Sequence, residues 1–160
     1  MHESAQAEHR WLEQLVGEWS CEWDSTVSPD PACSMSKARE RVRSLGGLWV
    51  VLEAEFAGPD GRVDQTIMTL GFNPKLGRFT GTFVGSMMTH LWVYSGTLDP
   101  GGRSLTLEAE GPSFDPEGGT ARYRDHVELV DDGSRVLWSE YLDKDGSWKR
   151  FMRAVYRRLA

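Results

Sequence analysis

The pattern of hydrophobic positions changes its period at one short stretch, residues 15–19, which read Leu-Val-Gly-Glu-Trp. Before this stretch, apolar side chains recur at helical spacing, at Trp11, Leu12, Leu15 and Val16. After it, hydrophobic and polar residues alternate, as they do in a strand with one buried face, and that face carries Trp19, Cys21 and Trp23. A helix that leads directly into a strand is therefore predicted.

The ends of the helix are predicted from its capping residues. Ser4 is a suitable N-cap, because its hydroxyl can accept a hydrogen bond from a free backbone N–H group. Gly17 stands where a left-handed residue is expected to end the helix, since glycine adopts that conformation without strain. The helix is predicted over residues 4–16.

Alternating runs continue through the rest of the chain, and turn residues separate them. Two such turns are Gly-Pro-Asp-Gly at 58–61 and Asp-Lys-Asp-Gly at 143–146. Further strands are predicted at 34–45, 48–57, 62–72, 78–88, 89–98, 104–111, 120–130, 135–142 and 148–158. With the first strand, this makes about ten strands joined mostly by short connections.

Short connections between sequential strands favour an antiparallel meander. An open sheet of this size would leave two unpaired edges, and closure into a barrel removes them. The predicted fold is therefore all-β: a closed antiparallel meander barrel of about ten strands, in one domain over 1–160, with one short N-terminal helix. A β-sandwich is the rival, but its crossovers need longer connections than this sequence offers.

The composition and net charge of the chain argue against several classes of protein. The net charge of −6 argues against a general nucleic-acid binder, which needs a basic surface. No apolar run reaches transmembrane length, and residues 1–4 lack a secretory signal. The two cysteines, Cys21 and Cys33, are too few for a disulfide framework, so a cytoplasmic location is expected. The oligomeric state stays open, and a homodimer is possible.

Several motifs, in this order and spacing, resemble those of the calycins, the superfamily of lipocalins and fatty-acid-binding proteins. Calycins carry a Gly-x-Trp at the start of the first strand, matched here by Gly17-Glu18-Trp19. More closely, the chain resembles a bacterial family of uncharacterised lipocalin-like domains. The motifs that carry this resemblance are Leu15–Trp19, Leu45-Gly46-Gly47, Leu70-Gly71-Phe72-Asn73, Asp143–Gly146 and Ala154–Arg158.

The resemblance implies a barrel, and it implies neither an established activity nor catalytic residues. It also implies that Trp19 plugs the closed end of the barrel, beneath a basic residue from the last strand. Either Arg157 or Arg158 is placed for that role. A cation over the indole face would be stabilised by a cation–π contact. Trp19 as a wall of the ligand site is the other interpretation.

A barrel of this size can hold a small ligand. If Trp19 faces inward, Cys21 and Trp23 do so too. The residues predicted to line such a cavity are Trp23, Phe56, Leu70, Phe72, Phe83, His90, Trp92, Tyr94, Leu107, Tyr123, Trp138 and Met152. The same side chains could instead fill the core completely, and the pattern does not separate these two possibilities.

The histidines show no metal-binding spacing. His90 shares a face with Trp92 and Tyr94, so it is the histidine expected inside. His126 shares a face with Arg122, Arg124 and Glu128, which is typical of a solvated outer surface. The alternative is an interior polar patch in which His126 binds a metal or haem. His2 and His9 are expected in a mobile N-terminal segment.

No catalytic or phosphate-binding motif is present; the sequence lacks a nucleophile elbow, a dinucleotide fingerprint and a phosphate loop. The predicted function is the binding of a small apolar or amphipathic molecule inside the barrel, without catalysis and without a cofactor. A haem-binding barrel of the nitrobindin type is one alternative, although Ser20-Cys21-Glu22 replaces the glycine-rich continuation of that group. A structural or interaction domain with a filled core is the other.

Overall fold

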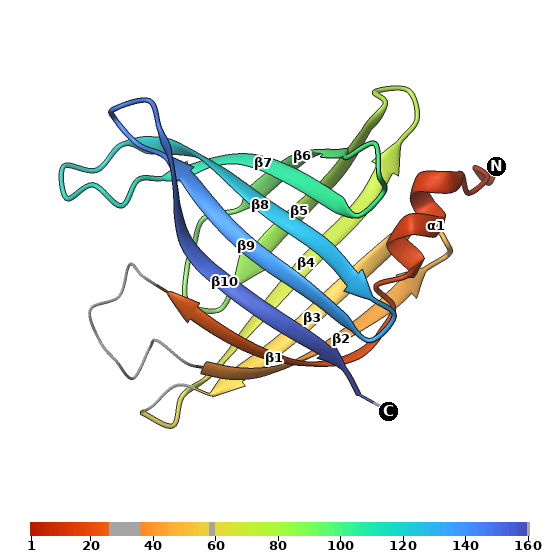
Figure 1. The fold of residues 1–160 in the computed structure, drawn as a ribbon, viewed down its shortest axis with the longest axis horizontal. Coiled ribbons are helices and arrows are strands. Elements are labelled where there is room, and N and C mark those ends of the chain that lie inside the picture. The colour runs from red at the N-terminus through yellow and green to blue at the C-terminus, as the bar shows by residue number, and fades with distance from the viewer. Residues whose placement is uncertain (26–35, 58–59, 160) are drawn as a thin grey trace.

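The computed structural model describes residues 1–25, 36–57 and 60–159, and it forms one closed barrel (Figure 1). The elements are α1 (Ala7–Glu13), β1 (Gly17–Ser25), β2 (Ser36–Leu45), β3 (Trp49–Ala57), β4 (Val63–Asn73), β5 (Arg78–Gly85), β6 (Trp92–Leu98), β7 (Ser104–Pro112), β8 (Thr120–Asp131), β9 (Ser134–Leu142) and β10 (Trp148–Arg158). Each strand pairs antiparallel with the next, and the predicted meander is confirmed.

The barrel closes because β1 pairs with β10 as well as with β2. Trp19 lies opposite Arg158 on one side and opposite Glu40 on the other. Because β1 and β10 pair with each other, neither of these two strands leaves an unpaired edge. The removal of the unpaired edges is the physical reason that a meander of this length forms a barrel. The alternative of a β-sandwich is therefore wrong.

The two ends of the barrel differ (Figure 1). The helix lies against one end, which we call the closed end, and both chain termini lie toward it. The described connections at the opposite end, the mouth, include residues 86–91, 113–119 and 143–147. Cys33 and its neighbours at 26–35 lie outside the described residues.

The helix closes its end by burying one apolar stripe. Trp11, Leu12 and Leu15 are all buried, and they join a core that includes Val50, Phe79 and Leu105. The Trp11 ring meets Phe79 edge-on, with 6.2 Å between ring centroids, and its Nε1 donates to the Gly102 carbonyl at 2.6 Å. A helix this short needs such a partner, because it is not stable alone. No helix in the described ranges has both the length and the apolar character to cross a membrane.

The helix starts later than the sequence indicates. Its N-cap is Gln6 rather than Ser4, and the backbone N–H of Gln6 donates to Nδ1 of His9 at 2.9 Å. The expectation of a mobile His9 is wrong as well. His9 is only 4% exposed, and its Nε2 lies 3.0 Å from the carbonyl of Phe72 in β4. His9 therefore contacts both the N-cap residue, Gln6, and the barrel wall at Phe72.

Trp19 lies at the centre of the closed end. It is 1% exposed, and its Nε1 donates to the carbonyl of Leu15 at 2.9 Å, which ties β1 to the last turn before it. The guanidinium of Arg158 lies 4.2 Å from its ring centroid. Arg158 therefore takes the position that the sequence left open between two arginines, and Arg157 does not. Arg157 is the neighbouring residue in β10 and is exposed.

Arg158 also binds backbone carbonyls from two other segments. It donates to Val16 at 2.7 Å, to Gln14 at 2.9 Å and to Asp132 at 3.0 Å. The first two bonds satisfy carbonyls at the exit of the helix, where the last carbonyls lack partners within the helix. One side chain thus joins the helix exit, β1 and the turn between β8 and β9.

Gly17 is required because Arg158 passes over it. A Cβ built on Gly17 would lie 2.4 Å from Nη1 of Arg158. Its φ of 143° is also a conformation that L-residues rarely adopt. The expected left-handed cap at this position is wrong, since Gly17 opens β1 and the C-cap is Gln14 in the right-handed region.

A second arginine was not anticipated at the plug. Arg135 of β9 is 2% exposed, and its guanidinium lies 4.7 Å from the Trp19 ring centroid and 3.8 Å from that of Tyr156. The indole therefore contacts one exposed arginine, Arg158, and one buried arginine. A buried cation beside two aromatic rings is better stabilised than one beside aliphatic side chains.

We expect Trp19→Ala to lower the free energy of unfolding by about 3–5 kcal/mol, because it removes a buried indole and leaves a cavity. Trp19→Ala/Arg158→Ala should cost less than the sum of the two single variants, since both remove one contact. Trp19→Ala/Arg157→Ala is the matched control and should be additive. Denaturant melts compare the three single and two double variants with the wild-type protein. A cost below about 1 kcal/mol for Trp19→Ala, the level of an ordinary substitution, would exclude it as the plug.

Candidate functional site

The barrel encloses a cavity of about 650 Å³. It extends from Arg135, near the plug, to Met87, Met88 and Phe114 in the mouth connections. Its volume is typical of small-molecule sites, which measure about 300–1,000 Å³. The interior is thus only partly filled by side chains, and the apolar core is concentrated at the closed end.

Most of the predicted cavity residues line this cavity. They are Phe56, Phe83, His90, Trp92, Tyr94, Tyr123 and Met152. Cys21 lines it as well. Trp23 lies in β1, two residues from Cys21, but its side chain is outside the described residues.

Three predicted residues lie at the wrong depth. Leu70, Phe72 and Leu107 face inward but belong to the closed-end core, where Leu70 and Leu107 are fully buried. Phe72 packs on Phe79 with 5.1 Å between ring centroids. Alternation shows which face a residue occupies, but it carries no information on its height along the barrel axis.

Trp138 is on the wrong face. Its neighbours Leu137 and Ser139 line the cavity, so Trp138 points outward. There it stacks on His126 with 3.7 Å between centroids, under the guanidinium of Arg150 at 4.1 Å. His126 in turn contacts Glu140 at 2.9 Å, as expected of a residue on the outer surface. Aromatic character alone misled the assignment, because arginine and histidine cover this indole from outside.

Phe151 was missed because of a β-bulge. The register of β10 against β9 shifts between Arg150 and Met152, and both Phe151 and Met152 then line the cavity. A bulge adds one residue to a strand and breaks the alternation. Phe151 packs against Phe114 with 5.0 Å between centroids, and Phe114 packs against Tyr123 at 5.7 Å. Aromatic rings therefore surround the mouth.

A buried ion pair lies at the deep end of the cavity. Arg135 Nη2 donates to Glu40 Oε1, and both side chains line the cavity. Burial raises the pKa of Glu40, and the Arg135 charge opposes that shift. Arg135 Nε has no hydrogen-bond partner among the described residues. A buried pair of this kind is seldom a net source of stability, because both ions lose their hydration.

Cys21 lies beside this pair, hydrogen-bonded to Tyr156. Burial raises the pKa of the Cys21 thiol to about 11, and hydrogen bonding from Tyr156 opposes the shift. The thiol is therefore protonated at neutral pH and is a poor nucleophile. This is the environment of a cavity wall rather than of a reactive cysteine.

A second polar cluster lies halfway up the wall. The Tyr94 hydroxyl donates to Asp125 Oδ2 at 2.5 Å, and the Ser139 hydroxyl donates to Asp125 Oδ1 at 2.6 Å. Burial raises the pKa of Asp125, and these two hydrogen bonds oppose the shift. Sequence reasoning missed Asp125, although the signal was present: it is two residues from Tyr123 in the same strand and so shares its face.

The contacts of His90 bear on whether the cavity suits haem. Its Nε2 lies 3.2 Å from the Glu110 carbonyl, and its ring contacts Trp92 edge-on at 4.7 Å. Histidine ligands of metals commonly donate their second N–H to such an acceptor, which would leave Nδ1 for the metal. The donor chemistry of His90 thus fits an axial ligand. No cluster of three or more metal-binding side chains occurs within the described ranges.

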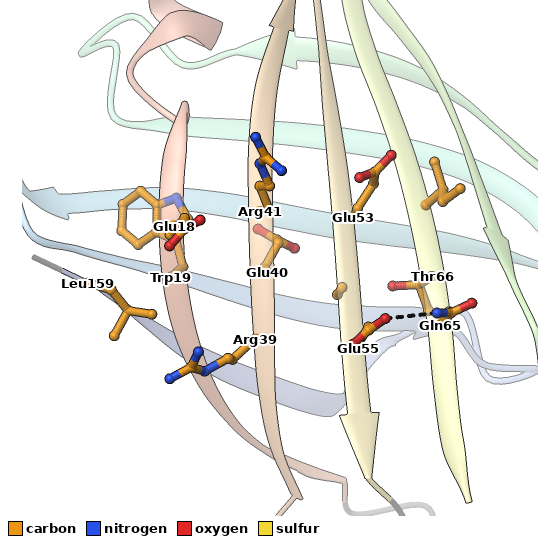
Figure 2. Close-up of a pocket in the computed structure, with 12 residues that line it drawn as sticks. Glu18, Trp19, Arg39, Glu40, Arg41, Glu53, Glu55, Gln65, Thr66 and Leu159 are labelled. Carbon is orange, nitrogen blue, oxygen red and sulfur yellow. Dashed lines mark hydrogen bonds between the residues drawn. The ribbon is translucent and has the colours of Figure 1, made fainter.

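A hollow of about 430 Å³ adjoins the outer face of β1 to β4 (Figure 2). Charges of opposite sign face one another across the strands there: Arg41 lies between Glu18 and Glu53, and Arg39 lies opposite Glu55. Glu55 also accepts from Gln65 at 2.8 Å, as the dashed line in Figure 2 shows. Such cross-strand pairs stabilise a sheet surface. This hollow is therefore better explained by a charged outer sheet surface than by a binding site.

Solved structures with this fold share little sequence identity with this chain. Rv2717c from M. tuberculosis has a TM-score of 0.63 and 12% identity, over 98% of this chain and 100% of its own. The S-type phycobiliprotein lyase CPES from Guillardia theta has a TM-score of 0.59 and 11% identity, over 97% and 94%. A redesigned β-barrel has a TM-score of 0.52 and 11% identity, over 98% and 100%. At these identities the likeness concerns the fold alone.

The structure of the lyase corrects one expectation. The prediction of a protein without catalysis is wrong as a conclusion from the barrel, because a barrel of the same fold occurs in a protein named as a lyase. A search of the curated proteins finds no match to this chain. The profile of one family, described as "Protein of unknown function (DUF1579)", matches residues 4–158, and the chain therefore belongs to that family.

Proposed function

We propose that this protein binds a small, mainly apolar molecule with one polar end inside the barrel. The observation that carries the proposal is the cavity of about 650 Å³, with aromatic and methionine side chains toward the mouth and hydrogen-bonding groups deeper inside. Sites of this composition bury most of a ligand in apolar surroundings and use a few polar groups to orient it.

The distribution of buried side chains supports this proposal over a filled core. Trp11, Leu15, Trp19 and Phe79 fill the closed end, and the cavity begins above them. An interior that served only stability would be packed along its whole length, because close packing strengthens every apolar contact. It would also avoid buried polar clusters such as Asp125 with Tyr94 and Ser139, which add desolvation costs.

Haem is the second candidate ligand, and the position of His90 favours it. Haemin added to the purified protein should then give a Soret band that His90→Ala weakens. His126→Ala is the matched control, since His126 lies on the outer surface, and it should leave the band unchanged. A spectrum without a Soret shift, or one that both variants alter equally, would exclude His90 as an axial ligand.

Filling part of the cavity should weaken binding. Ala54 of β3 lines the cavity, so Ala54→Phe places a ring inside it. Glu53→Phe is the matched control, because Glu53 is the preceding residue and its side chain is 45% exposed on the outer face. We expect Ala54→Phe to weaken the binding of an environment-sensitive apolar dye by about tenfold or more, the effect of losing one buried contact. Equal fluorescence titrations for the two variants would contradict an interior site.

The reactivity of Cys21 reports on the same cavity. In a Cys33→Ser background, thiol labelling of the native protein should be slow at pH 7 and should rise about tenfold per pH unit as the pH approaches the Cys21 pKa of about 11. The labelling rate rises with pH because only the thiolate reacts, and the fraction of thiolate increases with pH. A bound ligand should slow labelling further, since Cys21 lines the cavity. Rapid labelling at pH 7 would show that Cys21 is accessible and ionised.

A further inference from the structure

The charges inside the cavity indicate which polar end a ligand carries. Among the described residues that line the cavity are one basic side chain, Arg135, and three acidic ones, Glu40, Asp64 and Asp125. Arg135 is already paired with Glu40. Among the described residues, the lining is therefore acidic once this pair is set aside. An anionic head group would find its cation occupied and two further carboxylates nearby.

Among the described residues, no lysine or arginine pairs with Asp125 inside the cavity. Its two oxygens accept from the hydroxyls of Tyr94 and Ser139, which are neutral donors. The neighbouring imidazole of His126 favours the ionised form of Asp125, but His126 lies on the outer face and contacts Glu140. A buried carboxylate is costly unless a counter-charge or a proton neutralises it. A ligand that brought a positive charge would supply that missing partner.

Aromatic rings lie between Asp125 and the mouth. Tyr123 precedes Asp125 by two residues in β8, and Trp92 precedes Tyr94 by two residues in β6. Residues two apart on one strand face are separated by about 7 Å along the strand. The Trp92 and Tyr123 rings meet edge-on at 5.0 Å, and Tyr123 also meets Phe151 at 6.1 Å. Such rings attract ammonium groups through their π-faces, as aromatic cages do.

We infer that the ligand is a lipophilic cation, an amine whose ammonium group pairs with Asp125 while its apolar part occupies the aromatic region toward the mouth. This inference rests on the proposed binding function and adds the charge of the ligand. The Asp125 carboxylate, the Tyr94 hydroxyl and the nearby aromatic rings form its site. The Arg135–Glu40 pair closes the deep end of the cavity.

Three probes that share a ten-carbon alkyl chain and differ in their head group test this inference: decylamine, decanol and decanoate. The affinity of each is measured by calorimetry at low ionic strength. We expect the amine to bind about tenfold more tightly than the alcohol, since a hydrogen bond to a charged group is stronger than a neutral one. Decanoate should bind most weakly. Asp125→Asn should remove the preference for the amine and leave the affinity for decanol within about threefold.

Asp64→Asn is the matched control. Asp64 also lines the cavity, but it lies at the mouth end of β4 and accepts from the Ser86 hydroxyl at 3.0 Å. It should retain the preference for the amine. Asp125→Asn is expected to fold, because the amide oxygen can still accept from Tyr94 and the new NH₂ group can donate to Ser139, and a denaturant melt checks this.

The possible outcomes separate the two proposals. Binding of decanol without any preference for decylamine would overturn the inference and leave the binding function standing. Tightest binding of decanoate would overturn the inference in favour of Arg135 as the anchor. Loss of the preference in Asp64→Asn but not in Asp125→Asn would assign the cation to the mouth and overturn the inference as well. Failure of all three probes to bind would overturn the binding function itself.

Discussion

The contact between Trp19 and two arginines is the interaction on which the rest of the barrel depends. Closure of the sheet brings the first and last strands together, and Arg158 from β10 then lies over the indole of β1. The same guanidinium binds carbonyls at the helix exit, so the helix cannot leave the closed end without breaking these bonds. Gly17 is the consequence for the backbone, since any side chain there would collide with Arg158.

The plug also determines where the cavity lies. Because the helix and Trp19 occupy one end, the large apolar side chains concentrate there, and the interior beyond them is left open toward the mouth. Arg135 lies at the boundary. It contacts Trp19 in the plug and pairs with Glu40 in the cavity, so one buried side chain belongs to both regions.

The polar groups inside the barrel are difficult to explain by stability. Burial raises the pKa of both Glu40 and Asp125, which means that their charged forms are disfavoured where they lie. A hydrophobic replacement of similar size would often be as stable or more so. Their presence beside an open cavity supports the proposal of a ligand. Because the family has no established activity, the chemistry of that ligand is the main question.

The sequence by itself determined the fold class and the alternation of opposite faces within the strands. Alternation and turn residues depend on local geometry, so they predicted the closed meander, the helix before Trp19 and the inward position of side chains such as Tyr94 and Tyr123.

Only the tertiary structure decided how deep each inward side chain lies in the barrel, which side chains contact one another, and where the alternation of a strand is broken. Leu70 and Leu107 share the inward face with cavity residues but lie in the core, because height along the axis depends on strand register. The choice of Arg158 over Arg157, the bulge that turns Phe151 inward and the pairing of Arg135 with Glu40 all join residues far apart in the chain. Local pattern carries no information on such contacts, since the closure of the barrel creates them.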